Sequence, residues 1–185
     1  MMGWYRQWFK RLFDITVAVG GISVFALPMG WIAWQIRCRT GTPVLFRQTR
    51  IGYGGKIFTI LKFRTMTDEG RISSSLSHRL RGTAMDELPQ LINILKGEMS
   101  FVGPRPLIPD ELEELDRIPE GKRRLSVRPG LTGLAQINSE KVPSLSERIR
   151  WDLAYVDQCS LWLDLRILFK SLAVTLAGKW EPNGR

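Results

Sequence analysis

The feature that most constrains this chain is a long apolar segment, residues 12–36, whose only strongly polar members are Asp14 and Gln35. As one continuous helix it would extend about 37 Å, enough to cross a hydrocarbon layer about 30 Å thick. Basic residues flank both ends, Arg6, Lys10 and Arg11 on one side and Arg37 and Arg39 on the other. A spanning helix keeps its basic flank on the cytoplasmic side, so both flanks favour the same side of a membrane.

The middle of this segment contains helix-weakening residues. Gly20 and Gly21 are followed by Pro28, and a proline inside a helix costs about 3 kcal/mol or more. A bent, re-entrant helical hairpin satisfies both the flanks and the proline, and Pro28 is then the membrane-anchor residue. A kinked signal anchor is the alternative. A cleaved signal peptide is disfavoured because no small-residue cleavage site follows the apolar run.

The charge of the chain is uneven along its length. The net charge is +9, and residues 1–66 hold ten lysines and arginines against one acid, Asp14. An apolar segment surrounded by this excess of basic residues indicates binding to an anionic membrane surface. Nucleic-acid binding is not indicated, because the sequence has no basic stripe interleaved with aromatic residues. At 185 residues a single domain is expected. Two distant cysteines and one histidine, His78, exclude a disulfide framework, a cysteine-based zinc site and a two-histidine metal site.

After the apolar segment the pattern becomes β-rich. The runs 44–47 and 56–66, separated by the glycine-rich turn 52–55, predict a β-hairpin. Strand alternation puts Lys62 and Arg64 on one face. They are interpreted either as cations guarding a solvated strand edge or as a pair of phosphate contacts.

The remaining chain is predicted to be mostly helical. Residues 67–82 are Ser-rich and predict a loop, and Thr83 with Asp86 forms a capping-box pattern that predicts a helix over 83–96. A second helix is expected over 109–117, and the last forty residues are also predicted to be helical. Within them, 161–176 has an apolar stripe that suits either core packing or a membrane surface.

The strongest chemical signal is the pair Asp86-Glu87 at a predicted helix start. Neighbouring helical residues project about 100° apart, so the two carboxylates suit separate tasks, one attacking phosphorus and the other holding Mg2+. Simple helix capping is the plainer interpretation. Arg105, between two prolines, and Arg128, before Pro129, add rigidly presented guanidinium groups suited to phosphate.

These residues belong to a series of motifs that occur in one order along the chain: 10–14, 62–66, 86–91 with Asn93, 100–107, 127–133, and Asp152 with Tyr155 and Val156. In this series the chain resembles the bacterial sugar transferase family, the monotopic polyprenyl-phosphate phosphoglycosyl transferases, in its small catalytic-core-only form. The family's membrane helix breaks at a Ser-Pro pair, whereas Leu27 precedes Pro28 here and Ser23 is the candidate substitute.

The resemblance implies a function and a set of site residues. The implied reaction transfers a sugar-1-phosphate from a UDP-sugar to undecaprenyl phosphate, releasing UMP through a covalent aspartyl intermediate, as the first membrane step of glycoconjugate assembly. Asp86 matches the nucleophile and Glu87 the Mg2+ ligand. Arg81, Arg105 and Asp152 match family residues near the substrate, and Lys62, Arg64 and Arg128 complete the expected set.

The expected architecture is α+β and mostly helical: one domain, with a re-entrant anchor over residues 1–40 and a catalytic part over 41–185 that carries interfacial amphipathic helices. The implied location is the inner (cytoplasmic) membrane of a bacterium, with the catalytic part facing the cytoplasm. The phospholipid membrane is an expected partner, nucleic acid is not, and a homo-oligomer is left open. A non-catalytic membrane-surface scaffold is the alternative function.

Overall fold

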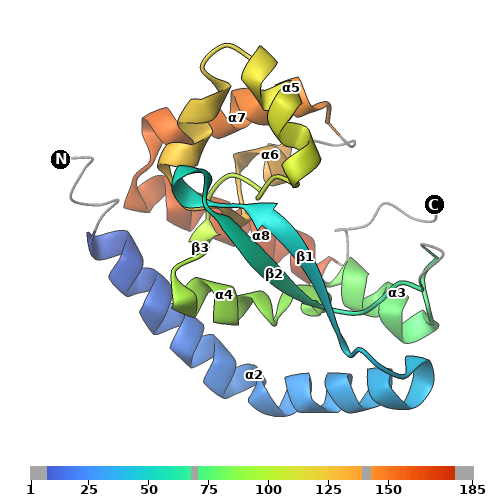
Figure 1. The fold of residues 1–185 in the computed structure, drawn as a ribbon. Helices are drawn as coiled ribbons and strands as arrows, with labels where there is room; N and C mark the ends of the chain where they lie inside the picture. The colour runs from blue at the N-terminus through green and yellow to red at the C-terminus, as the bar shows by residue number, and fades with distance from the viewer. Residues whose placement is uncertain (1–7, 68–70, 139–142, 178–185) are drawn as a thin grey trace.

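One long helix, α2 (Lys10–Thr40), follows the lower edge of the molecule and changes direction near its middle (Figure 1). The computed structural model describes residues 8–67, 71–138 and 143–177. Pro28 lies inside α2, where a missing N–H and a ring clash bend a helix. The Ser23 hydroxyl donates to the Val19 carbonyl at 3.0 Å, so it does not serve Val24, whose carbonyl Pro28 leaves without its usual donor.

The first half of α2 is attached to the body by buried polar groups. Lys10 Nζ donates to Asp164 Oδ2 at 2.5 Å. Asp14 Oδ1 accepts from Ser100 Oγ at 3.0 Å and from the backbone N–H of Phe101 at 3.1 Å. Lys10 and Asp14 therefore fix the start of α2 to the rest of the protein.

The second half of α2 is attached by apolar packing. Ile32 and Ile36 are buried against Phe63 and Leu80, which come from the hairpin and from a short helix. Both ends of α2 thus contact the same body.

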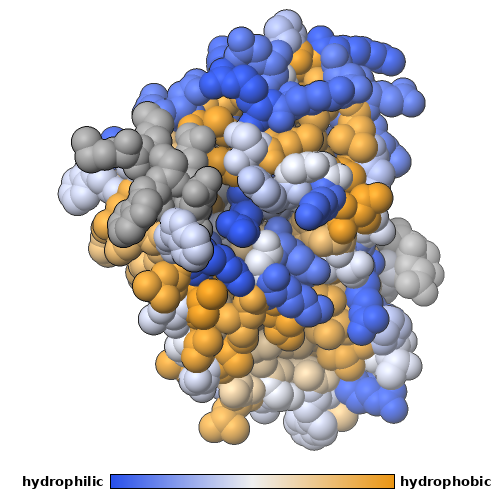
Figure 2. Space-filling model, turned by 60° about the vertical axis from the view of Figure 1, so that its left-hand side comes forward, coloured by the Kyte–Doolittle hydropathy of each residue, from blue (hydrophilic) through white to orange (hydrophobic). Residues whose placement is uncertain are grey.

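The opposite side of α2 exposes apolar side chains, among them Leu12, Val19, Val24, Phe25, Leu27, Trp31 and Trp34. Figure 2 shows this apolar surface over the lower part of the molecule, with hydrophilic side chains gathered over the upper part. By length and composition α2 is the one helix among the described residues that could cross a membrane. The expected long apolar helix is confirmed.

The predicted hairpin is confirmed and its first strand is longer than expected. Strands β1 (Leu45–Ile51) and β2 (Ile57–Phe63) pair antiparallel, with Leu45 opposite Phe63, and a 3-10 turn, η2 (Tyr53–Gly55), joins them. Phe58 and Ile60 point into a core that also contains Ala18 of α2. The hairpin therefore crosses the middle of the molecule above α2 (Figure 1).

The segment between the hairpin and the acidic pair differs from the prediction. The expected loop contains a helix, α3 (Ser75–Gly82), because the Ser74 hydroxyl accepts from the Ser77 N–H and caps its start. The predicted helix over 83–96 is wrong in its first half. Thr83 ends α3 instead of starting a helix, and its hydroxyl donates to the Arg79 carbonyl.

The two acidic residues accordingly lie in a separate 3-10 turn, η3 (Met85–Glu87), and the helix α4 follows only at Gln90–Lys96. Asn93, on α4, donates its amide to the Thr59 carbonyl at 2.7 Å, and its carbonyl oxygen accepts from the Leu61 N–H at 3.1 Å. This amide ties α4 to β2.

A second small sheet was not predicted. Strands β3 (Ser100–Val102) and β4 (Gly130–Thr132) pair in parallel, and each contains only three residues. The backbones pass so closely that a Cβ added at Gly130 would lie 2.1 Å from the Gly103 nitrogen. Glycine is required there by space.

The remaining helices cover the upper part and the back of the molecule (Figure 1). The expected helix over 109–117 is confirmed as a 3-10 turn followed by a helix, and the C-terminal region contains two helices. The bounds are η4 (Pro109–Glu111), α5 (Leu112–Arg117), η5 (Gly121–Ser126), α6 (Leu134–Asn138), α7 (Leu145–Gln158) and α8 (Leu161–Leu176). Residues 178–185 of the predicted helical tail lie outside the described residues.

The core-packing interpretation of 161–176 is confirmed for one face of the helix. On α8, Ile167 is buried in a core with Val102 and Tyr155. Trp162 and Phe169 are exposed on the other side. The helix therefore combines core packing with an exposed apolar face.

We predict that Gly130→Ala lowers Tm by roughly 5 °C or more, because overpacking a close contact costs about 1–3 kcal/mol. Gly30→Ala is the control, since a Cβ at Gly30 meets nothing within 4 Å. Thermal unfolding of both variants in detergent is the measurement. Equal Tm values for the two would show that the β3–β4 approach is looser than described.

Candidate active site

Asp86 and Glu87 are presented by a sharp reversal of the chain. Ala84 has a left-handed backbone with φ of 53°, an uncommon conformation for a residue with a Cβ. Its N–H donates to the Arg81 carbonyl at 3.1 Å, which closes the end of α3. The chain then enters the 3-10 turn that carries the two carboxylates. Strained backbone of this kind clusters at functional sites.

Glu87 is surrounded by cations. Lys62, on β2, donates to Glu87 Oε1, so the structure brings these two predicted residues together. Burial opposes the charged form of Glu87, but Lys62 and Arg105 outweigh it and hold the pKa of Glu87 below its usual value. Glu87 is therefore an anion at neutral pH.

Asp86 is in the opposite electrostatic state. It is 8% exposed, and burial, followed by the neighbouring charge of Glu87, raises its pKa to about 6. Lys62 and Arg81 oppose this shift, which places Arg81 within electrostatic range of Asp86. One carboxylate pair thus contains an anion held by cations and a desolvated group that ionises just below neutral pH.

A small pocket lies on the Glu87 side of the pair. Its lining is mainly polar and cationic, and the residues are Arg50, Ile60, Lys62, Glu87, Gln90, Arg105, Pro106, Gly130 and Leu131. Gln90 is 2% exposed, and its side chain lies next to Glu87 and helps to lower the pKa of that carboxyl. Three cations around one carboxylate suit an anionic ligand such as a phosphate.

Two predicted residues, Arg64 and Arg128, have contacts elsewhere. The Arg64 guanidinium donates to the carbonyls of Thr40 and Thr42, both at 3.0 Å, so Arg64 and Lys62 do not act as a pair. Arg128 donates to the Gly97 carbonyl at 3.0 Å and its guanidinium lies 5.6 Å from the centre of the Tyr53 ring.

Asp152 is buried in an ion pair with Arg124 at 2.7 Å. Burial is the main reason that its pKa is raised to about 6, although Arg124 opposes the shift. It does not line the pocket around Glu87.

Sequence reasoning missed Arg50, Gln90 and Arg124. Arg50 stands on β1 among other strand cations, and nothing local distinguishes it from Arg47. Arg124 follows Arg123 in a basic run, yet Arg124 is buried and Arg123 is exposed. The pairing of β1 with β2 could have singled out Arg50, because Phe58 faces it in the register and points into the core.

The donor set fits magnesium only with help from a substrate. Among the described residues no group of three or more His, Cys, Asp or Glu side chains comes together. Two adjacent carboxylates are what Mg2+ commonly takes from a protein when phosphates supply further oxygens. The residues present are therefore compatible with Mg2+ bound together with a phosphorylated substrate.

Comparison with known proteins gives the family. The model of the bacterial sugar transferase family matches residues 5–178. This chain belongs to the bacterial sugar transferase family.

Among individual family members, the chain is 41% identical to the uncharacterized sugar transferase EpsL of Bacillus subtilis, over 86% of this chain and 83% of that protein. It is 38% identical to a UDP-glucose:undecaprenyl-phosphate glucose-1-phosphate transferase of Caulobacter vibrioides, over 88% of this chain and 68% of the relative. With the galactosyl transferase CpsE of Streptococcus agalactiae the identity is 36%, over 91% of this chain but only 42% of the relative. The chain thus spans less than half of some sugar transferases that it resembles.

In this sugar transferase the raised pKa of Asp86 predicts a pH-dependent stability difference. A group whose pKa is raised on folding stabilises the protein below its unfolded pKa, and this contribution is lost as the pH rises through about 6. Asp86→Asn should therefore be more stable than the unmodified protein at pH 8, by on the order of 1–3 kcal/mol, and the difference should be smaller at pH 5 than at pH 8.

Thermal unfolding of both proteins at pH 5 and pH 8 measures this difference. Asp110→Asn is the control, because Asp110 is exposed and should show no such gap. A gap that stays constant across the two pH values would contradict the buried, protonatable Asp86.

Proposed function

We propose that this chain transfers a sugar-1-phosphate from a UDP-sugar to undecaprenyl phosphate and releases UMP. The carrying observation is the contrast within one turn between buried Asp86 and cation-bound Glu87. The printed names of the relatives in Caulobacter vibrioides and Klebsiella pneumoniae state this class of reaction for those proteins. Two other relatives are named exopolysaccharide production proteins.

In the first step an Asp86 carboxylate oxygen forms a bond to the phosphorus that carries the sugar. The bond from that phosphorus to the UMP oxygen breaks, and its electron pair leaves with UMP. Asp86 must be ionised to attack, so the step requires a pH above about 6. Its burial leaves it poorly solvated, so less hydration must be removed before attack.

In the second step a phosphate oxygen of undecaprenyl phosphate attacks the same phosphorus. The bond to Asp86 breaks, Asp86 leaves as a carboxylate, and a diphosphate-linked sugar is formed. Lys62, Arg81 and Arg105 supply fixed positive charge around the pair, which offsets negative charge gathering on the phosphoryl oxygens.

Glu87 would hold Mg2+, which when bound would neutralise phosphate charge and favour departure of UMP. Glu87 is already an anion, the form in which a carboxylate binds a metal. Lys62 donates to Oε1 of this carboxylate.

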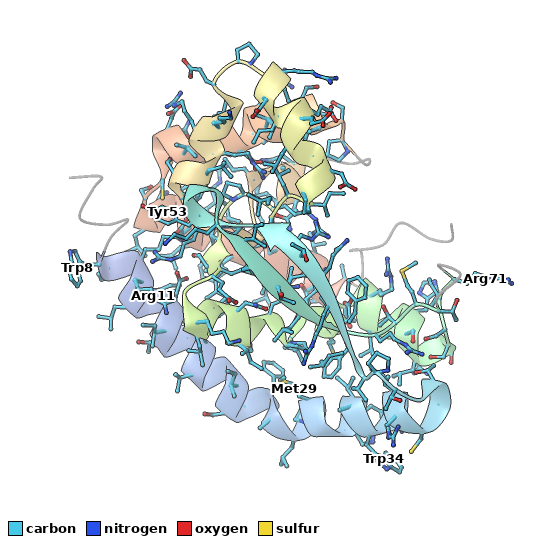
Figure 3. All side chains as sticks on the ribbon, viewed as in Figure 1. Trp8, Arg11, Met29, Trp34, Tyr53 and Arg71 are labelled. Carbon is cyan, nitrogen blue, oxygen red and sulfur yellow. The ribbon has the colours of Figure 1, made fainter. Side chains whose placement is uncertain are left out.

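We further propose that α2 is re-entrant, with both ends on the cytoplasmic side of the inner membrane of a bacterium. If α2 crossed the bilayer, its two ends would lie at opposite interfaces, and the hydrophilic body that contacts both would fill the hydrocarbon between them. Trp8 and Trp34 lie toward opposite ends of α2 and point away from the body (Figure 3). Tryptophan favours the headgroup level, which suits both ends lying at one interface.

A re-entrant anchor would hold Asp86 near the depth of the lipid phosphate and raise the effective concentration of the second substrate. A membrane-surface scaffold is the competing function, in which Asp86 and Glu87 only shape a turn. Release of UMP from members of a UDP-sugar panel distinguishes the two.

We predict that Asp86→Asn abolishes turnover and covalent labelling while leaving the protein folded, because an amide keeps the shape but does not attack phosphorus. The unmodified protein, incubated with Mg2+ and a UDP-sugar labelled at the sugar-bearing phosphate but without lipid, should retain the label after denaturation. Asp110→Asn should label normally. Label retained on Asp86→Asn would rule out Asp86 as the nucleophile.

We also predict that both flanks of α2 face the cytoplasm. In a background with Cys38 and Cys159 changed to Ser, single cysteines at Gly3 and Lys56 should resist a membrane-impermeant reagent in intact cells. Changing Gly20, Gly21 and Pro28 to Leu should straighten the helix and expose the Gly3→Cys site. Labelling of that site without these changes would mean a true span.

A further inference from the structure

The loop that carries Arg105 has an unusual backbone arrangement. Four successive carbonyls, from Pro104 to Leu107, each accept a hydrogen bond, and the donors come from β1, η5 and β4. The donors are Gly130 N to Pro104 at 2.9 Å, Arg124 Nη2 to Arg105 at 2.6 Å, Arg50 Nη1 to Pro106 at 3.0 Å, and Ile51 N to Leu107 at 2.9 Å. Every residue from 104 to 107 therefore has its backbone carbonyl held by a hydrogen bond.

The side chain of Arg105 is in the opposite situation. Within the described residues its guanidinium makes no hydrogen bond or ion pair, and its interactions are electrostatic, with Glu87 and Arg50. It borders the pocket beside Glu87. A fixed backbone with an uncommitted guanidinium fork suits bidentate binding of a phosphate that arrives from solution.

Among these four donors, Arg124 is the one that forms an ion pair with a carboxylate in the described part of the chain, that of Asp152. It is 4% exposed and Asp152 is 3% exposed. Arg124 Nε and Nη2 lie 2.9 Å and 2.7 Å from Asp152 Oδ2, and the same Nη2 donates to the Arg105 carbonyl. Asp152 is therefore connected to the Arg105 loop through the guanidinium of Arg124.

Stability alone is a poor reason for such a pair. The desolvation of two buried charges roughly cancels their attraction, so an apolar pair would often serve as well. A planar guanidinium held by a carboxylate can, however, aim a donor at one fixed point.

We propose that Asp152, through Arg124, is a positioning residue that fixes the Arg105 backbone so that its guanidinium meets the diphosphate of the nucleotide substrate. This inference rests on the proposed function for the identity of the substrate. It replaces direct substrate binding by Asp152 with an indirect role.

Arg124→Lys tests the role while keeping the buried charge balanced. The single ammonium of lysine pairs with Asp152 but does not hold the Arg105 carbonyl with the planar fork of a guanidinium. Arg123→Lys is the matched control. Arg123 is the neighbouring residue, it is exposed, and it pairs with Asp157, which lies on α7 as Asp152 does.

The measurement is the affinity for UDP in the presence of Mg2+, taken with and without Arg105→Ala. Arg124→Lys should weaken UDP binding about tenfold when Arg105 is present and less than twofold when Arg105 is Ala, and Arg123→Lys should change neither value. On a UDP-sugar that is turned over, KM should rise by a similar factor. Asp152→Asn, assayed below its Tm, is a second variant and should follow the same pattern.

An equal loss of UDP affinity in both backgrounds would overturn the proposal, because the pair would then be acting on the fold in general. Unchanged UDP affinity in folded Arg124→Lys would overturn it as well. Failure of the unmodified protein to release UMP from any UDP-sugar would instead remove the proposed reaction, while the comparison of UDP affinities would still test the positioning role.

Discussion

The attachment of Asp14 to β3 is the contact on which the rest of the arrangement depends. The Asp14 carboxylate, inside an apolar helix, accepts from Ser100 and Phe101, so this helix and the first strand of the small sheet have one relative position. The strand β3 continues directly into the loop that carries Arg105, and β4 packs against it with no space for a side chain at Gly130. The position of α2 and the position of the loop that carries Arg105 are therefore linked through β3.

Two neighbouring carboxylates acquire different chemistry from surroundings alone. Glu87 faces Lys62 and Arg105 and remains an anion, whereas Asp86 is buried against its neighbour's charge and holds a proton until about pH 6. The turn beginning at Ala84 creates this difference because it aims the side chains into unlike environments. Reactivity here follows from backbone direction as much as from residue type.

The parts of the fold that rest on local pattern were predictable, and those that rest on distant contacts were not. The apolar helix α2 and the hairpin could be predicted from spacing. Thr83 was wrongly predicted to begin a helix, because the left-handed backbone conformation of Ala84 cannot be predicted from an alanine in the sequence. Strands of three residues, and the burial of Arg124 beside exposed Arg123, arise only when remote segments meet.

The fixing of both ends of α2 to one body also orders events during biosynthesis. The helix leaves the ribosome before the segments that supply its partners, and domains fold as units from the N-terminal side. Ala18 and Ile32 pack with Ile94 and Leu80, which are synthesised later, so the core is complete only after these partners have left the ribosome. A body made without α2 would expose those partners to water, so α2 is a surface against which the rest of the chain folds.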